Sequence, residues 1–199
     1  MLGLLARPNG FFSLPLYFLT SLLHLLLVFS KPRQLDSQSS LYDSALRALT
    51  RRAYSVHEMK QLLSRRSDNS ELIHLVIELL KREGHLDDAR FAKQFARQRT
   101  QTRRQGKFRI ARDLRARGVP DRHIEAALAE AASETDESAL VRQRIERKLR
   151  SFRGEIDERK LASIYRSLLR AGFPADVVHR QLKSITRDEI SGAAPAAEE

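Results

Sequence analysis

Cysteine and tryptophan are both absent from this 199-residue sequence, and only 8 glycines occur in it. The absence of cysteine excludes a disulfide scaffold, a zinc site with cysteine ligands and a cysteine nucleophile. It also suits a protein of the reducing cytoplasm. The low glycine content disfavours a sheet-rich fold with many tight turns. Leu, Ala, Arg, Glu and Gln dominate instead, and these are strong helix formers. The sequence therefore predicts an all-α protein.

Motifs that would indicate catalysis or cofactor binding are missing. Gly106-Lys107 lacks both the upstream glycine and the following Ser or Thr of a phosphate-binding P-loop. No two of the six histidines are four residues apart, so no helical pair is available for a metal. The paired carboxylates of Asp87 and Asp88 precede a predicted helix, where they would cap backbone N–H groups. We therefore expect no enzyme activity, no cofactor, no metal and no small-molecule substrate.

The first thirty residues are unusually apolar. Residues 10–30 contain no acidic or cationic side chain other than His24, and about 20 such residues can cross a bilayer. A membrane anchor and a signal peptide are two interpretations of this stretch. A start assigned too far upstream is the third, and we favour it because the helical pattern begins only near Leu41. A membrane is an expected partner only if the extension is translated.

From Leu41 onward a pattern of three amphipathic helices repeats. Shifting the middle of the chain by 54 positions aligns the following pairs: Ile110 with Ile164, Leu114 with Leu168, Gly118 with Gly172, Pro120 with Pro174, Ile124 with Val178 and Leu128 with Leu182. Each glycine is expected to end a helix in the left-handed conformation, and each proline to start the next helix. A shift of 51 aligns the first unit, where Ser67 and Asn69 take the glycine and proline positions.

Repeats of about 50 residues usually stack, so that each unit buries its apolar face against its neighbour. We therefore predict an elongated, curved array. Its expected segments are an apolar extension, three helical repeats and a disordered tail, at residues 1–40, 41–84, 85–133, 134–188 and 189–199. Within the first repeat, Ser55 and Glu58 have the spacing of a helix-capping box.

Positive charge is concentrated in the middle of the chain. The net charge is +11, and residues 85–133 account for +6 of it. Between Arg90 and Arg117, eleven basic residues face one acid, Asp113. Most of the eleven are arginines, and a planar guanidinium can hold a carboxylate or phosphate through two hydrogen bonds. The stretch predicts an anionic partner, which is either DNA or an acidic protein surface, whereas a solvated helical surface is the alternative explanation.

The predicted partner-binding residues lie on the outward faces of the first two helices of the second repeat and in their connection: Arg90, Arg97, Arg99, Arg103, Arg104, Lys107, Arg109 and Arg112. The apolar side chains between them have helical spacing and are interpreted as core residues: Phe91, Ala92, Phe95, Phe108, Ile110 and Leu114. A helix-turn-helix that reads DNA is a further alternative. Its recognition helix would be residues 121–130, which are more acidic than basic, and this opposes contact with phosphates.

Three stretches in order resemble the RecX family of recombination regulators. They are Leu86–Ala92 with Arg97 and Arg99 after it, Gly106–Ile110 continued by Leu114–Val119, and Tyr165–Phe173. The likeness extends from about Leu41 to Ile185. The departures are the apolar extension, Ser67-Asp68-Asn69 in place of Gly-x-Pro, and a tail rich in Ala and Glu.

The resemblance implies a regulatory protein of three tandem three-helix repeats that lies in the groove of a RecA–DNA filament. There it would restrain filament growth, ATP turnover, strand exchange and the coprotease response, and so act in recombination, DNA repair and the SOS response. Its DNA contacts would be to the backbone, mainly through the filament. The alternative is a helical nucleic-acid-binding protein that acts without RecA.

Overall fold

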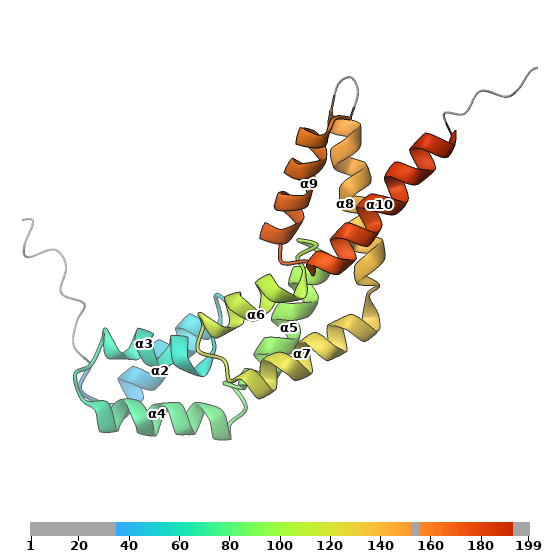
Figure 1. Cartoon of the computed structure of the whole chain (residues 1–199). Coiled ribbons are helices and arrows are strands. Elements are labelled where there is room, and N and C mark those ends of the chain that lie inside the picture. The colour runs from blue at the N-terminus through green and yellow to red at the C-terminus, as the bar shows by residue number, and fades with distance from the viewer. Residues whose placement is uncertain (1–34, 153–155, 193–199) are drawn as a thin grey trace, which may run out of the picture.

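The structure is a computed structural model that describes residues 35–152 and 156–192. This part of the chain contains nine α-helices and no strand, which confirms the predicted all-α class and its tandem helical repeats. The helices form three units arranged in a bent, elongated array (Figure 1). None of the helices described is long and apolar enough to span a membrane. The apolar stretch 10–30, with its three interpretations, lies outside the described residues.

The first unit consists of α2 (Gln38–Leu49), α3 (Val56–Ser64) and α4 (Ser70–Arg82). The predicted capping box at the start of α3 is confirmed. Ser55 Oγ accepts a hydrogen bond from the Glu58 N–H at 3.1 Å, and the Glu58 carboxylate accepts one from the Ser55 N–H at 3.3 Å. The apolar faces of the three helices enclose a core of Leu41, Ala45, Met59, Leu63, Ile73, Val76, Ile77, Leu80 and Leu86.

The second unit consists of α5 (Asp88–Gln101), α6 (Lys107–Arg115) and α7 (Asp121–Glu134). Asp87 caps α5 as predicted, because its Oδ1 accepts from the N–H groups of Ala89 and Arg90 at 2.8 and 3.0 Å. These bonds hold the pKa of the Asp87 carboxyl below its usual value. The core contains Phe91, Ala92, Ala96, Ile110, Ala111, Leu114, Val119, Ile124, Ala127 and Ala131.

The third unit consists of α8 (Glu137–Ser151), α9 (Glu158–Arg170) and α10 (Ala175–Gly192). Its core contains Val141, Ile145, Ile164, Leu168, Ala171, Phe173 and Val178. The helix α10 continues through Gly192, so residues 189–192 are helical rather than part of the predicted disordered tail. A helix that is already formed extends at little cost, because each added residue contributes one more backbone hydrogen bond.

At both junctions a backbone carbonyl at an equivalent position of the repeat accepts a hydrogen bond from the preceding unit, although the donor differs. At the first junction, between the first and second units, Ser55 Oγ donates to the Arg117 carbonyl at 2.6 Å. At the second junction, between the second and third units, the Gly106 N–H donates to the Ala171 carbonyl at 2.9 Å. In both cases the turn that ends the middle helix of one unit packs against the start of the middle helix of the preceding unit.

The same carbonyl position is also occupied at the N-terminal end of the array. Arg66 is the residue of the first unit that is equivalent to Arg117, and its carbonyl accepts a hydrogen bond from the Leu35 N–H at 2.7 Å. The backbone that precedes α2 therefore takes the place of a preceding unit.

The second junction is tight because two glycines bring their backbones together. A Cβ atom on Gly106 would lie 2.3 Å from the Gly172 oxygen, and one on Gly172 would lie 2.3 Å from the Arg109 nitrogen. Gly172 also has a φ of +90°, which side chains rarely adopt. Both positions therefore require glycine, and the angle between the second and third units is set by direct backbone contact.

Candidate partner-binding surface

The eight predicted binding residues lie on two different surfaces. Arg90 and Arg97 line a groove between α5 and α7 together with Lys93. In this groove the acidic residues of α7 neutralise the cations: Lys93 Nζ lies 2.7 Å from Glu130, and Arg97 Nε lies 3.4 Å from Glu134. The positive charge of this surface is therefore largely paired within the protein.

The other predicted cations lie at the end of α5, in the connection and on α6. The side chain of Arg99 is half-buried, with its guanidinium carbon 4.7 Å from the centre of the Phe95 ring. Burial lowers the pKa of Arg99, and the charges of Arg103, Arg117 and Arg109 lower it further. The charge of Asp113 raises this pKa, but burial and the three like charges outweigh it.

Acidic compensation is sparse on this second surface. Asp113 is shared by two cations, since its carboxylate lies 4.0 Å from Arg109 Nε and 3.9 Å from Arg112 Nε. Within the described part of the chain, no acidic side chain lies within 4.0 Å of Arg103 or Arg104. Several guanidinium groups here therefore carry charge that the protein itself does not balance.

The third unit adds two arginines that the sequence did not single out. Arg144 of α8 donates from Nη1 to the Arg104 carbonyl at 2.5 Å across the second junction. Burial lowers the pKa of Arg144, and the charges of Arg147, Arg104 and Arg109 lower it further. Acidic residues are interspersed along the sequence around Arg144, so local charge density could not have revealed it. Only the packing of the two units shows it.

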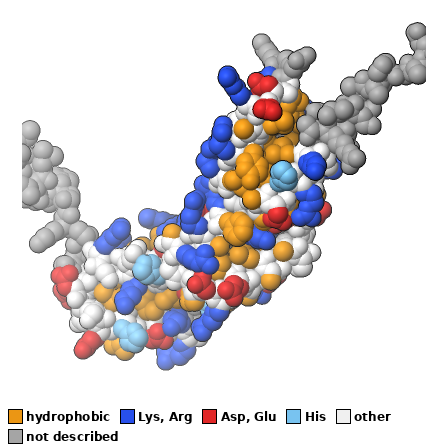
Figure 2. Space-filling model, in the orientation of Figure 1, with side chains coloured by type: hydrophobic (Ala, Val, Ile, Leu, Met, Phe, Trp, Pro, Cys, Tyr) orange, Lys and Arg blue, Asp and Glu red, His pale blue; other side chains and the backbone are white. Residues whose placement is uncertain are grey.

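Arg117, which also acts on Arg99, is paired with Glu58 and is set apart from the others. We call the remaining residues the arginine cluster; they are Arg99, Arg103, Arg104, Arg109, Arg144 and Arg147. Figure 2 shows Lys and Arg side chains along the inner edge of the bend, from the third unit down to the second. Guanidinium groups that repel one another and lack acids are stabilised when an anion binds among them. The cluster is therefore suited to carboxylates or phosphates.

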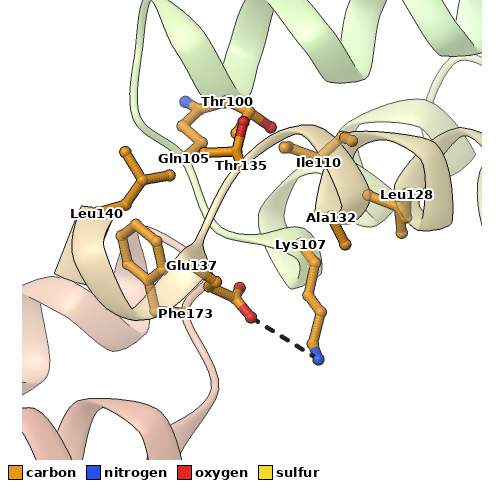
Figure 3. A pocket seen from close by; sticks show the side chains of 11 residues that line it. Thr100, Gln105, Lys107, Ile110, Leu128, Ala132, Thr135, Glu137, Leu140 and Phe173 are labelled. Atoms are coloured by element: carbon orange, nitrogen blue, oxygen red, sulfur yellow. Dashed lines mark ion pairs between the residues drawn. The ribbon is translucent and has the colours of Figure 1, made fainter.

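A small pocket lies at the second junction behind this surface (Figure 3). Its volume is about 90 Å³, far below that of a typical ligand site. At its edge Lys107 Nζ lies 3.9 Å from Glu137. Gly106 has no side chain to cap α6, and the Glu137 carboxyl lies near the Lys107 N–H at this end of the helix. Burial raises the pKa of Glu137, although the charge and the N–H of Lys107 lower it.

The interpretation of Phe108 as a core residue is wrong, because its side chain is 59 % exposed. The register of α6 explains the error. Ile110, Ala111 and Leu114 fill the buried face of this short helix, and Phe108 lies outside that face. No group of acidic and histidine side chains that could hold a metal occurs among the described residues.

Comparisons with known proteins agree with this arrangement of units. Residues 87–128 match the family model described as RecX, second three-helix domain. The chain is 37 % identical over 156 residues to the regulatory protein RecX of Halorhodospira halophila, covering 78 % of this chain and 94 % of that protein. It is 33 % identical over 151 residues to the regulatory protein RecX of Trichlorobacter lovleyi, covering 74 % and 96 %.

The fold is also similar to that of a solved structure. The crystal structure of RecX from Lactobacillus salivarius matches with a TM-score of 0.66 at 22 % identity, and the match covers 75 % of this chain and 96 % of that one. At this identity the likeness concerns the fold alone.

Proposed function

Because this chain belongs to the RecX family of regulatory proteins, we propose that it binds in the groove of a RecA–DNA filament. In this proposal it mostly inhibits the recombinase, its ATP turnover and its coprotease activity. It would thereby regulate recombination, DNA repair and the SOS response in the cytoplasm, without catalysing a reaction of its own. DNA would be contacted through its backbone, mainly within the filament.

The observation that supports this proposal best is the arginine cluster at the second junction. It contains guanidinium groups from two units, and Arg103 and Arg104 have no acidic neighbour within 4.0 Å in the described part of the chain. In this proposal the filament groove presents protein carboxylates and DNA phosphates, and arginine binds both through paired hydrogen bonds. A partner that supplies such anions would relieve the repulsion within the cluster.

The rigidity of the array supports the same proposal. An array of repeats presents a long surface, and the backbone contact of Gly106 with Gly172 holds the second and third units at one angle. A rigid array that contacts more than one protomer would oppose the movements by which a filament grows and exchanges strands.

The experiment compares two variants, and in each of them three basic residues are replaced by Glu. In one variant the clustered residues Arg99, Arg103 and Arg104 are replaced by Glu. In the control variant the groove residues Arg90, Lys93 and Arg97 are replaced by Glu. Both change the net charge equally, and inhibition of RecA-driven strand exchange is measured with each. We expect the cluster variant to inhibit strand exchange about 10-fold or more weakly than wild type. The control variant should retain most of the inhibition.

Three results would contradict this assignment in different ways. If wild-type protein leaves strand exchange unchanged, the inhibitory function itself is wrong. If both variants inhibit like the wild type, these arginines are not the contact. If both variants lose inhibition to the same extent, net charge rather than the cluster determines binding.

The second candidate is a nucleic-acid-binding protein that acts without RecA, and the cluster also supports it, since it could hold phosphates directly. This candidate predicts tight binding to bare DNA. The logarithm of its affinity would fall by roughly 0.7–0.9 per phosphate contact against the logarithm of salt concentration. Strong binding to filaments beside weak binding to bare DNA favours the first candidate.

A further inference from the structure

An exposed aromatic side chain lies next to the arginine cluster. Phe108, on the first turn of α6, is 59 % exposed. The equivalent positions hold His57 in the first unit and Ala162 in the third, so the repeat does not require an aromatic residue here. A single exposed hydrophobic residue is ordinary on a protein surface. The surroundings of Phe108 are what distinguish it.

Phe108 is held in place at the second junction. Its N–H donates to the Gly172 carbonyl at 3.1 Å, and the Gly172 N–H donates to the Leu169 carbonyl at 2.9 Å. Leu169 is itself exposed, at 37 %. Two exposed hydrophobic residues from different units are thus connected through the backbone of one glycine. A phenylalanine on a rigid backbone has only two side-chain torsions to restrict, so burying it in an interface costs little entropy.

The residues on both sides of Phe108 in the sequence are basic, and their acidic neighbours, Glu137 and Asp113, lie 3.9 and 4.0 Å from them. Lys107 Nζ lies 5.6 Å from the centre of the Phe108 ring. On the other side in sequence, Arg109 donates from Nη1 to the Arg170 carbonyl at 3.3 Å and belongs to the arginine cluster. Hydrophobic contact area surrounded by cations is complementary to a segment that carries an apolar side chain among carboxylates.

We propose that Phe108 is the hydrophobic anchor for an acidic segment of the protein partner. An apolar side chain of that segment packs against Phe108 and Leu169, while its carboxylates pair with the arginine cluster. The inference rests on the proposed function, in which the partner is the RecA filament, and it assigns the contact to protein rather than to DNA.

Two observations favour a protein segment over a single strand of DNA. Strand-binding proteins stack successive bases on several aromatic side chains, whereas Phe108 is the single aromatic residue among the large exposed hydrophobic side chains of the described chain. The others, Leu75 and Leu169, are aliphatic and cannot stack on a base. Lys107 also lies close to the Phe108 ring, where a base would have to compete with it.

The test measures the affinity of four proteins for RecA filaments assembled on single-stranded DNA with a non-hydrolysable ATP analogue. They are the wild type, Phe108→Ala, Phe108→Met and, as a control, Leu75→Ala, which removes a side chain exposed to 55 % on the distant α4. We expect Phe108→Ala to bind roughly 10- to 30-fold more weakly. Phe108→Met, which keeps apolar area and loses the ring, should remain within about 3-fold of wild type, as should Leu75→Ala. Unfolding curves of each variant check that the fold is intact.

The same proteins are titrated with a bare poly(dT) oligonucleotide, on which Phe108→Ala should have no effect. If Phe108→Ala and Phe108→Met both weaken oligonucleotide binding as much as filament binding, the ring stacks on a base and the proposal is overturned. Filament binding by Phe108→Ala equal to that of wild type also overturns it and leaves the proposed function standing. If wild-type protein fails to bind filaments, the proposed function fails first.

Discussion

At the first junction Glu58 lies between two arginines, and at the second junction its place in the repeat is taken by Arg109. Glu58 pairs with Arg52 at 3.0 Å and with Arg117, and all three belong to the contact between the first two units. Arg109 instead joins a group of arginines that have few acids nearby. The same carbonyl position accepts a hydrogen bond at both junctions, from a serine hydroxyl at the first and from a backbone N–H at the second. Only the second junction keeps unbalanced positive charge.

This difference in charge indicates that the two junctions are held together in different ways. At the first junction, charge contributes to joining the units, because a mostly buried Glu58 needs the guanidinium of Arg117. At the second junction the glycines Gly106 and Gly172 join the units through backbone contact. Arg144 and Arg109 add hydrogen bonds to carbonyls across this junction, and their positive charge is left without a buried acidic partner such as Glu58. The proposed binding surface thus coincides with the junction whose stability depends least on ion pairs.

The largest expected effect comes from adding a methyl group where the two backbones meet. Gly106→Ala would place a Cβ atom 2.3 Å from the Gly172 oxygen, so the third unit must shift. We expect a loss of about 3 kcal/mol in the free energy of unfolding, together with a changed small-angle scattering profile. The measurement is urea unfolding followed by scattering in solution.

Gly84→Ala is the matched control for this change. Gly84 has a φ of +73°, and a Cβ there would meet nothing within 4 Å. It should therefore cost only the backbone strain of about 1–2 kcal/mol and leave the scattering profile unchanged. Equal losses for both variants would contradict a junction held by close backbone contact.

The next largest effect on stability is expected from replacing the charged residues at the two junctions. Glu58→Gln leaves Arg117 without its carboxylate, and we expect a loss of about 1–3 kcal/mol in the free energy of unfolding. Arg144→Gln at the second junction should change Tm by less than about 2 °C, because it removes one hydrogen bond to the Arg104 carbonyl but also relieves the repulsion from neighbouring arginines. Thermal unfolding measures both. A larger loss for Arg144→Gln than for Glu58→Gln would contradict this difference between the two junctions.

The smallest expected effect is on the pH dependence of stability, and its sign differs between two carboxylates. Hydrogen bonds lower the folded pKa of Asp87, so its contribution is present above about pH 3.8 and is lost as pH falls through the folded pKa. Burial raises the folded pKa of Glu137, so its contribution is present below about pH 4.5 and is lost as pH rises through the folded pKa.

Thermal unfolding of Asp87→Asn and Glu137→Gln between pH 3 and pH 8 tests both signs. The Tm advantage of wild type over Asp87→Asn should grow as pH rises from 3. Its advantage over Glu137→Gln should shrink as pH rises above about 4.5. Parallel curves for the two variants would show that neither carboxylate has the assigned environment.

The local elements of the fold could be predicted from the sequence, because their causes are local. The capping box of Ser55, the cap of Asp87 and the left-handed Gly118 and Gly172 depend on neighbours within a few residues. The period of 51 to 54 residues then predicted three similar units. These features are independent of how the units are placed relative to one another.

The candidate site could be predicted only in part, because charge pairing depends on contacts between distant residues. Counting charges put Arg97 and Arg104 in one group, but Glu134 of α7 neutralises Arg97 while Arg104 meets Arg144. The exposure of Phe108 could not be predicted either, because its spacing in the sequence resembles that of its buried neighbours. Only the packing of the units shows which cations are paired and which side chains remain exposed.

The proposed function depends most directly on the arginine cluster that spans the second junction. Arg144 tests the cluster because this residue comes from the third unit. The measurement is equilibrium binding of Arg144→Gln to assembled RecA filaments over a range of salt concentrations. The control is Arg142→Gln, two residues away on α8, whose side chain is hydrogen-bonded to Gln181 and Ser184. The proposed function predicts about 10-fold weaker binding and a shallower salt dependence for Arg144→Gln alone. Equal affinities and equal salt slopes for the two variants would contradict it.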